Sequence, residues 1–174
     1  LPDIGRLLNE PVHECRLTAL LILVEKYSKS DCISRKEIFD FYLSKTGRIN
    51  NWDLVDLSAP KIVGHYLLDK DRSILHTLAA SSSLWEQRIA VVSTYSFIRN
   101  SDYADTIKIC ESLLGHTHDL IHKATGWMLR EAGKRDEKVL IEFLDKHHKS
   151  MPRTMLRYSI EKLDESLKKK YMAK

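Results

Sequence analysis

The segment Trp85-Glu86-Gln87-Arg88-Ile89 has three counterparts elsewhere in the chain, and their spacing decides the fold. Each counterpart carries a basic residue near its centre: His13-Glu14-Cys15-Arg16-Leu17, Leu120-Ile121-His122-Lys123-Ala124 and Thr154-Met155-Leu156-Arg157-Tyr158. The four basic residues are separated by 72, 35 and 34 residues, and the first separation is two steps of 36 whose skipped step falls on Trp52. A period near 35 residues with two helices per period is typical of an α-solenoid. Because this period is shorter than the usual HEAT length, we expect HEAT-like antiparallel helix pairs.

Helical periodicity outside these segments supports the same all-α class. Between Val12 and Tyr27 the apolar side chains form a single stripe, and no segment shows convincing strand alternation. Ser34 with Glu37 resembles a capping box for a helix that Gly47 ends. Asn50 or Asn51 is expected to cap the next helix, and Pro60 to begin another. Further helices are expected over about 72–80, 84–99, 102–114, 118–132, 136–148, 153–163 and 165–172.

Size and composition indicate a single domain spanning residues 1–174 of an intracellular protein. The chain has 174 residues, 43% of them hydrophobic, with few Gly and Pro. Cys15, Cys32 and Cys110 are scattered without a C-x-x-C pair, which argues against a disulfide framework or a thiolate zinc site. We therefore expect a cytoplasmic monomer without membrane-spanning segments or a signal peptide. Because the chain begins with Leu1 close to a helical pattern, we also expect that N-terminal helices are missing.

The periodic basic residues predict a DNA-binding surface. Arg88, Lys123 and Arg157 each lie early in the second helix of a pair, and second helices tend to line the concave face of a curved solenoid. A row of cations along a concave groove would neutralise DNA phosphates, and the net charge of +4 agrees with such a partner. In the alternative interpretation, these residues form ion pairs that join neighbouring repeats.

Two tryptophans occur in unusual settings. Trp52 and Asp56 are four residues apart, so they share a helix face; alternatively, Trp52 is buried and Asp56 caps the helix near Pro60. Trp127 shares a face with Lys123 in the same way. Gly126, directly before Trp127, costs a helix about 1 kcal/mol relative to Ala, so we expect that another segment approaches the helix closely there. Such a glycine is equally consistent with tight packing around a core Trp127.

Three segments together resemble a known family. Trp52-Asp53-Leu54-Val55-Asp56, Trp85-Glu86-Gln87-Arg88-Ile89-Ala90 and Lys123-Ala124-Thr125-Gly126-Trp127-Met128-Leu129-Arg130-Glu131 are similar to the signature stretches of the AlkD-like DNA alkylation repair glycosylases. They occur in the same order and at similar spacing, and the segment from Pro152 to Lys162 resembles the family's C-terminal helix. The resemblance extends from about residue 20 to residue 171, whereas the family's first N-terminal helices have no counterpart.

The resemblance implies an alkylpurine DNA glycosylase that acts in base excision repair on duplex DNA. It implies that Asp56 is the catalytic carboxylate and that Trp52 and Trp127 pack against the deoxyribose of the lesion. Arg88 would hold a DNA phosphate, with further backbone contacts from Lys123, Arg130, Arg153 and Arg157. Cationic N3- or N7-alkylated purines leave as neutral bases, so one carboxylate that stabilises the developing sugar cation can suffice, with no metal or other cofactor.

Two alternative functions differ from this interpretation. The first is a non-catalytic HEAT-like scaffold that binds DNA or protein, although such a scaffold would have no reason to combine Trp52, Asp56, Arg88 and Trp127. The second is a metal-dependent hydrolase centred on His116, His118 and His122. His118 and His122 are spaced as a possible metal pair, but no third ligand is apparent and the H-E-x-x-H signature is missing. We therefore expect solvated surface histidines.

Overall fold

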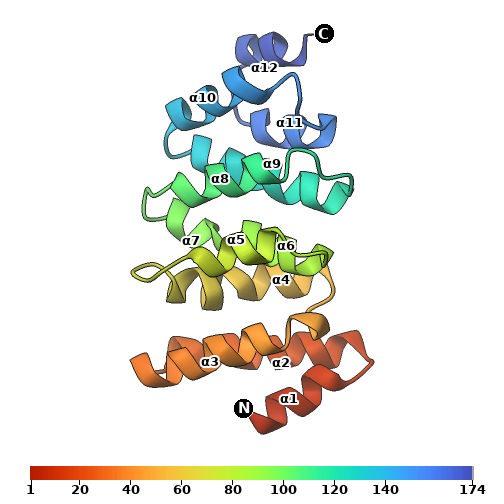
Figure 1. Cartoon of the computed structure of the whole chain (residues 1–174), viewed down its shortest axis with the longest axis vertical. Helices are drawn as coiled ribbons and strands as arrows, with labels where there is room; N and C mark the ends of the chain where they lie inside the picture. The colour runs from red at the N-terminus through yellow and green to blue at the C-terminus, as the bar shows by residue number, and fades with distance from the viewer. Residues whose placement is uncertain (174) are drawn as a thin grey trace.

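The fold is a stack of helices that runs from the N-terminus at one end to the C-terminus at the other (Figure 1). The computed structural model describes residues 1–173, and within this range it contains helices and connecting turns but no strand. The elements are α1 (Pro2–Asn9), α2 (His13–Ser28), α3 (Cys32–Ser44), η1 (Thr46–Arg48), α4 (Trp52–Ala59), η2 (Pro60–Gly64), α5 (Ser73–Ala79), α6 (Leu84–Ser93), α7 (Tyr95–Ile98), α8 (Ala104–Ser112), α9 (Asp119–Gly133), α10 (Glu137–His147), α11 (Arg153–Ile160) and α12 (Glu165–Met172).

One layer of the stack contains the second helix of each pair. In this layer, which we call the site layer, α2 packs on α4, α4 on α6, α6 on α9 and α9 on α11. The first helices α1, α5, α8 and α10 pack against their neighbours in the site layer, and α3 packs against α2 and η2. The predicted all-α solenoid of helix pairs is therefore confirmed. Among the described residues, no helix is long and apolar enough to cross a membrane.

The helices are held together by two clusters of buried apolar side chains and by close backbone approaches. The main cluster of buried side chains runs from Ile4 to Ala132, and a second one joins α10, α11 and α12. A Cβ atom at Gly126 would lie 2.5 Å from the Cβ atom of Tyr158 and 2.6 Å from the carbonyl oxygen of Met155. The close approach predicted at Gly126 is therefore present, and it sets the distance between α9 and α11.

Helix boundaries follow the predicted signals in most places. Asn51 caps α4, because its side chain accepts a hydrogen bond from the backbone of Trp52, and Asp136 caps α10. Pro60 begins η2, a single π-helical turn that continues α4. Helix α12 spans the predicted residues.

Four details differ from the sequence-based expectations. The N-cap of α3 is Asp31 rather than Ser34: the Asp31 carboxylate accepts a hydrogen bond from the Ser34 backbone, and the helix begins at Cys32, three residues earlier than a Ser34 cap implies. The same helix ends at Ser44, before Gly47. The helix expected over 84–99 is interrupted at Thr94, whose hydroxyl donates to the carbonyl of Val91. Helix α1 was not predicted.

The repeat also differs in register at α4. Arg88, Lys123 and Arg157 are each the fifth residue of their helices, α6, α9 and α11. The fifth residue of α4 is Asp56, whereas Trp52 is the first. An acidic residue therefore occupies the position in α4 that is basic in the next three helices of the site layer.

Candidate active site

The centre of the site is an ion pair between Asp56 on α4 and Arg88 on α6. The Nε and Nη2 atoms of Arg88 donate to the two carboxylate oxygens of Asp56 at 2.9 and 2.8 Å, and Nη1 donates to the carbonyl of Leu120 at 2.6 Å. Arg88 is 5% exposed, whereas the Asp56 side chain retains 19% exposure. Paired hydrogen bonds of this kind fix the plane of a carboxylate and leave further lone pairs on its oxygens for other partners.

The surroundings of Asp56 shift the pKa of its carboxyl group. Burial raises the pKa of the Asp56 carboxyl above its ordinary value, and the hydrogen bonds and positive charge of Arg88 oppose this effect. Asp53, one turn before it, also raises the pKa of Asp56. The carboxylate is thus held in one orientation by a buried guanidinium but remains reachable from solvent.

The four residues predicted at the site line one hollow. Trp52, Asp56, Arg88 and Trp127 border a space of about 310 Å³, together with Leu120, Lys123, Arg130 and Tyr158. Trp52 is 53% exposed, so the alternative of a buried Trp52 is wrong. The alternative in which Asp56 caps the helix near Pro60 is also not observed, since both of its oxygens accept hydrogen bonds from Arg88.

The predicted row of free cations needs correction. Arg88 is buried in its ion pair, so it is not part of an exposed basic stripe. Lys123 pairs with Asp119 within α9 at 2.7 Å, and Arg130 contacts Glu161 of the next pair. Of the three residues in the predicted row, the alternative of ion pairs between repeats therefore holds for Arg88 alone.

The C-terminal end of the site layer has different cations. Arg153 and Arg157 on α11 are exposed, and neither forms an ion pair with another described residue. Arg157 is therefore the member of the predicted row that is free to contact a phosphate.

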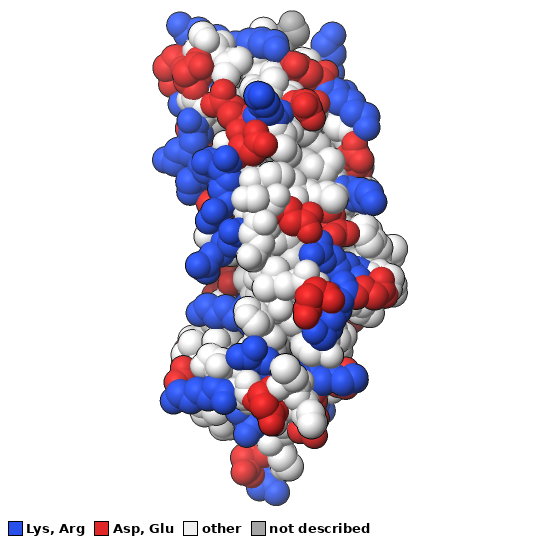
Figure 2. Space-filling model, turned by 90° about the vertical axis from the view of Figure 1, so that its left-hand side faces the viewer, with Lys and Arg blue, Asp and Glu red and all other residues white. Residues whose placement is uncertain are grey.

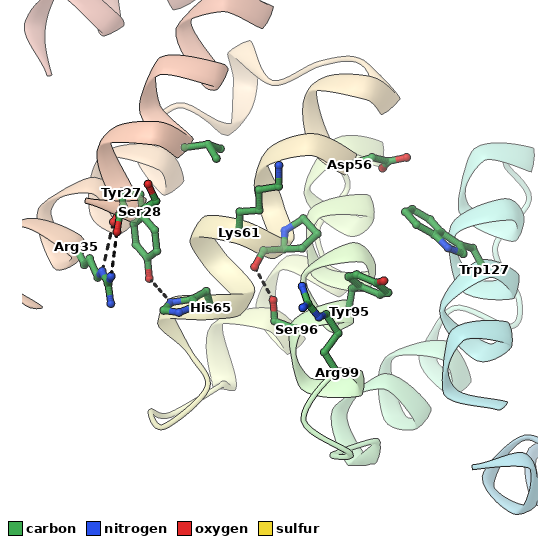
Figure 3. Close-up of a pocket in the computed structure, with 12 residues that line it drawn as sticks. Tyr27, Ser28, Arg35, Asp56, Lys61, His65, Tyr95, Ser96, Arg99 and Trp127 are labelled. Carbon is green, nitrogen blue, oxygen red and sulfur yellow. Dashed lines mark hydrogen bonds between the residues drawn. The ribbon is translucent and has the colours of Figure 1, made fainter. Parts of the chain in front are cut away.

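A second hollow, of about 410 Å³, also has Asp56 and Trp127 in its wall (Figure 3). Its wall includes Tyr95, whose ring lies 6.1 Å from that of Trp127 between centroids, and the cations Lys61 and Arg99. The complete lining is Val24, Tyr27, Ser28, Arg35, Asp56, Pro60, Lys61, His65, Tyr95, Ser96, Arg99 and Trp127. Asp56 and Trp127 therefore border both hollows.

Sequence reasoning missed Lys61, Tyr95 and Arg99. A signal existed for two of them, because Tyr95 and Arg99 follow Arg88 by seven and eleven residues and so share its helix face. Lys61 carried no such signal, since the π-helical turn at Pro60–Gly64 changes the face on which the following residues lie.

The histidine cluster has a structural role. The His118 side chain accepts a hydrogen bond from the backbone of Leu120 at the start of α9, and the His116 side chain accepts one from the backbone of His118. Within residues 1–173, no group of three or more His, Cys, Asp or Glu side chains is arranged to hold a metal ion.

A comparison with protein families identifies the chain. The sequence model of the DNA alkylation repair enzyme family matches residues 3–163. The chain belongs to this family.

Structural comparison agrees on the fold of this DNA alkylation repair family member. A predicted DNA alkylation repair enzyme from Enterococcus faecalis superimposes with a TM-score of 0.75 at 16% sequence identity, over 94% of this chain and 75% of the other. No curated protein matches the sequence. Membership of the family supports a role in the repair of alkylated DNA, with DNA as the partner.

Proposed function

We propose that the protein is a DNA glycosylase that hydrolyses the N-glycosidic bond of N3- or N7-alkylated purines in duplex DNA and leaves an abasic site. The observation that carries this proposal is the position of Asp56. Its carboxylate is fixed by Arg88, is partly exposed, and lies in a hollow bordered by Trp52 and Trp127.

The chemistry of the substrate explains why one carboxylate can suffice. An N3- or N7-alkylated purine is already cationic and departs as a neutral base, so the leaving group needs no protonation. The transition state concentrates positive charge on the sugar, and a fixed negative charge close to it lowers the barrier. The Asp56 carboxylate supplies that charge and can orient the attacking water. Because the positive charge of Arg88 partly offsets the negative charge of Asp56, the contribution of Arg88 to catalysis is to orient the carboxylate.

Trp52 and Trp127 offer surfaces on which the deoxyribose of the lesion can pack beside the Asp56 carboxylate. Trp52 exposes about half of its side chain although it is large and apolar, which is costly unless the ring meets a ligand. The faces of Trp52 and Trp127 offer electron-rich surfaces on which a sugar with cationic character can pack. No base pocket is required for this arrangement, because the contacts are to the sugar and backbone.

The surface charge is compatible with duplex DNA. On the face drawn in Figure 2, Lys and Arg side chains gather along one edge, beside a strip of uncharged side chains. Arg153 and Arg157 add exposed cations at the C-terminal end of the site layer. We propose that this layer is the concave, DNA-facing side of the solenoid and that contacts to phosphates give affinity without reading sequence.

Product analysis tests the proposal directly. Duplex DNA treated with a methylating agent is incubated with the protein, and free 3-methyladenine and 7-methylguanine are quantified together with abasic sites. The proposal expects both methylated bases in excess of spontaneous loss, with abasic sites in equal number. If the protein binds the DNA but releases no base, it is a non-catalytic DNA-binding scaffold.

A further inference from the structure

The hollow that Lys61 and Arg99 border is not explained by the role of Asp56 alone. We propose that it is a phosphate-binding clamp, in which Lys61 and Arg99 hold the DNA backbone next to the lesion nucleotide. This inference rests on the proposed glycosylase function, because it places the substrate strand across Asp56.

The pairing of cations around the site supports this assignment. In the hollow that contains Trp52, the cations Arg88, Lys123 and Arg130 all have carboxylate partners within the protein. In the second hollow, Lys61 and Arg99 are exposed, and their side chains form no hydrogen bond or ion pair with any residue in the range 1–173. Unpaired cations can bind a phosphate without first breaking an internal ion pair, so they are the more effective contacts.

The backbone brings these two cations to the same space from neighbouring elements. Lys61 is in η2, directly after Pro60, and Arg99 follows the last residue of α7. The two elements pack against each other, and the hydroxyl of Ser96 donates to the carbonyl of Pro60 at 2.6 Å. Figure 3 shows Lys61 and Arg99 bordering the same hollow as Asp56 and Trp127.

The uncharged part of the wall fits the rest of a nucleotide. Tyr95 and Trp127 present neighbouring aromatic rings, and Val24 and Pro60 add apolar surface. Burial lowers the pKa of His65, which favours the uncharged form of this ring. An aromatic floor with cations beside it matches a deoxyribose and its phosphate, which present an apolar edge and an anion.

The salt dependence of DNA binding tests the clamp. Binding of unmethylated, fluorescently labelled duplex DNA is measured by anisotropy over a series of KCl concentrations for the wild type and a Lys61→Ala/Arg99→Ala variant. Each phosphate contact that is lost should reduce the slope of log K against log [KCl] by about 0.9. We therefore expect a shallower slope by about 1 to 2 and weaker binding at low salt.

A matched control removes two charges elsewhere. Lys108 on α8 and Lys138 on α10 are exposed, form no ion pair with a described residue and lie outside both hollows. The Lys108→Ala/Lys138→Ala variant has the same net charge as the Lys61→Ala/Arg99→Ala variant. It should nevertheless retain the wild-type slope. All four substituted residues are exposed, so thermal unfolding of both variants should match the wild type.

The possible outcomes separate the clamp from the proposed function. If the wild type binds DNA and both double variants keep the wild-type slope, the clamp is wrong while DNA binding stands. If the two double variants lose slope equally, binding depends only on net charge, and the clamp is again wrong. If the wild type binds no DNA at any salt concentration, both the clamp and the proposed function are overturned.

Discussion

Arg88 and Asp56, 32 residues apart in the sequence, form two hydrogen bonds that join α6 to α4. The third hydrogen bond of Arg88, to the carbonyl of Leu120, extends the connection to α9. One buried side chain thus holds three helices of the site layer and orients the proposed catalytic carboxylate. We therefore expect stability and the proposed activity to be coupled at this position.

Removal of Arg88 should be strongly destabilising. Arg88→Ala leaves the largely buried Asp56 carboxylate without its partner, and a broken buried pair costs about 3–5 kcal/mol of unfolding free energy. The partial exposure of Asp56 places the expectation at the lower end of that range. Urea unfolding of the wild type, the two single variants and the Arg88→Ala/Asp56→Asn double variant gives the coupling energy. Additive losses would show that the pair does not interact as described.

Gly126→Ala should destabilise the contact between α9 and α11. The new Cβ atom would clash with Met155 and Tyr158, and the strain of an overpacked contact, about 1–3 kcal/mol, exceeds the gain of about 1 kcal/mol in helix propensity. Gly115→Ala is the control, since a Cβ atom there would have no neighbour within 4 Å and the φ of Gly115 is not positive. Equal unfolding midpoints for the two variants would contradict the close approach.

Trp52→Ala should reduce activity with little effect on stability. The ring is about half exposed, so its removal creates no cavity, and we expect a change in unfolding free energy within about 0.5 kcal/mol. The rate of base release should nevertheless fall, because the ring would no longer pack on the sugar. Single-turnover release from methylated DNA and thermal unfolding are measured on the same sample. A large loss of stability with unchanged release would make Trp52 a structural residue.

Base release should depend on the ionisation of Asp56. Because burial raises the pKa of this carboxyl, it takes up a proton at higher pH than an exposed aspartate does. The protonated form carries no charge to stabilise the sugar cation. Enzyme-dependent release should therefore be constant above this pKa and fall as the pH decreases through it, after subtraction of spontaneous base loss. A rate that rises towards acid pH after this subtraction would exclude an ionised Asp56 from the reaction.

The sequence was sufficient for the architecture because the signals of an α-solenoid are local and periodic. The spacing of Arg88, Lys123 and Arg157 located the second helices, and Asn51 marked the start of α4. The N-cap of α3 was predicted wrongly, because Ser34 with Glu37 matches the capping-box pattern although the cap is Asp31.

The sequence did not reveal which basic side chains pair with carboxylates of neighbouring helices. A row of basic residues has the same pattern whether its members face solvent or carboxylates of neighbouring helices. Arg88 faces Asp56, because the fifth position of α4 is acidic where the next three helices of the site layer have a cation. Lys61 was missed for a related reason, since its face depends on a π-helical turn that has no sequence signature.

The most direct test of Asp56 compares release of free methylated purine from methylated duplex DNA by the wild type and by Asp56→Asn. Asp53→Asn is the matched control: this carboxylate lies on the same helix but pairs with His13, at 2.8 Å, and borders neither hollow. Circular dichroism and DNA binding verify that all three proteins are folded and bind at the assay temperature. We predict that Asp56→Asn binds DNA but releases no base above the spontaneous rate, whereas Asp53→Asn retains release. Base release by a folded Asp56→Asn variant at the wild-type rate would contradict the catalytic role of Asp56.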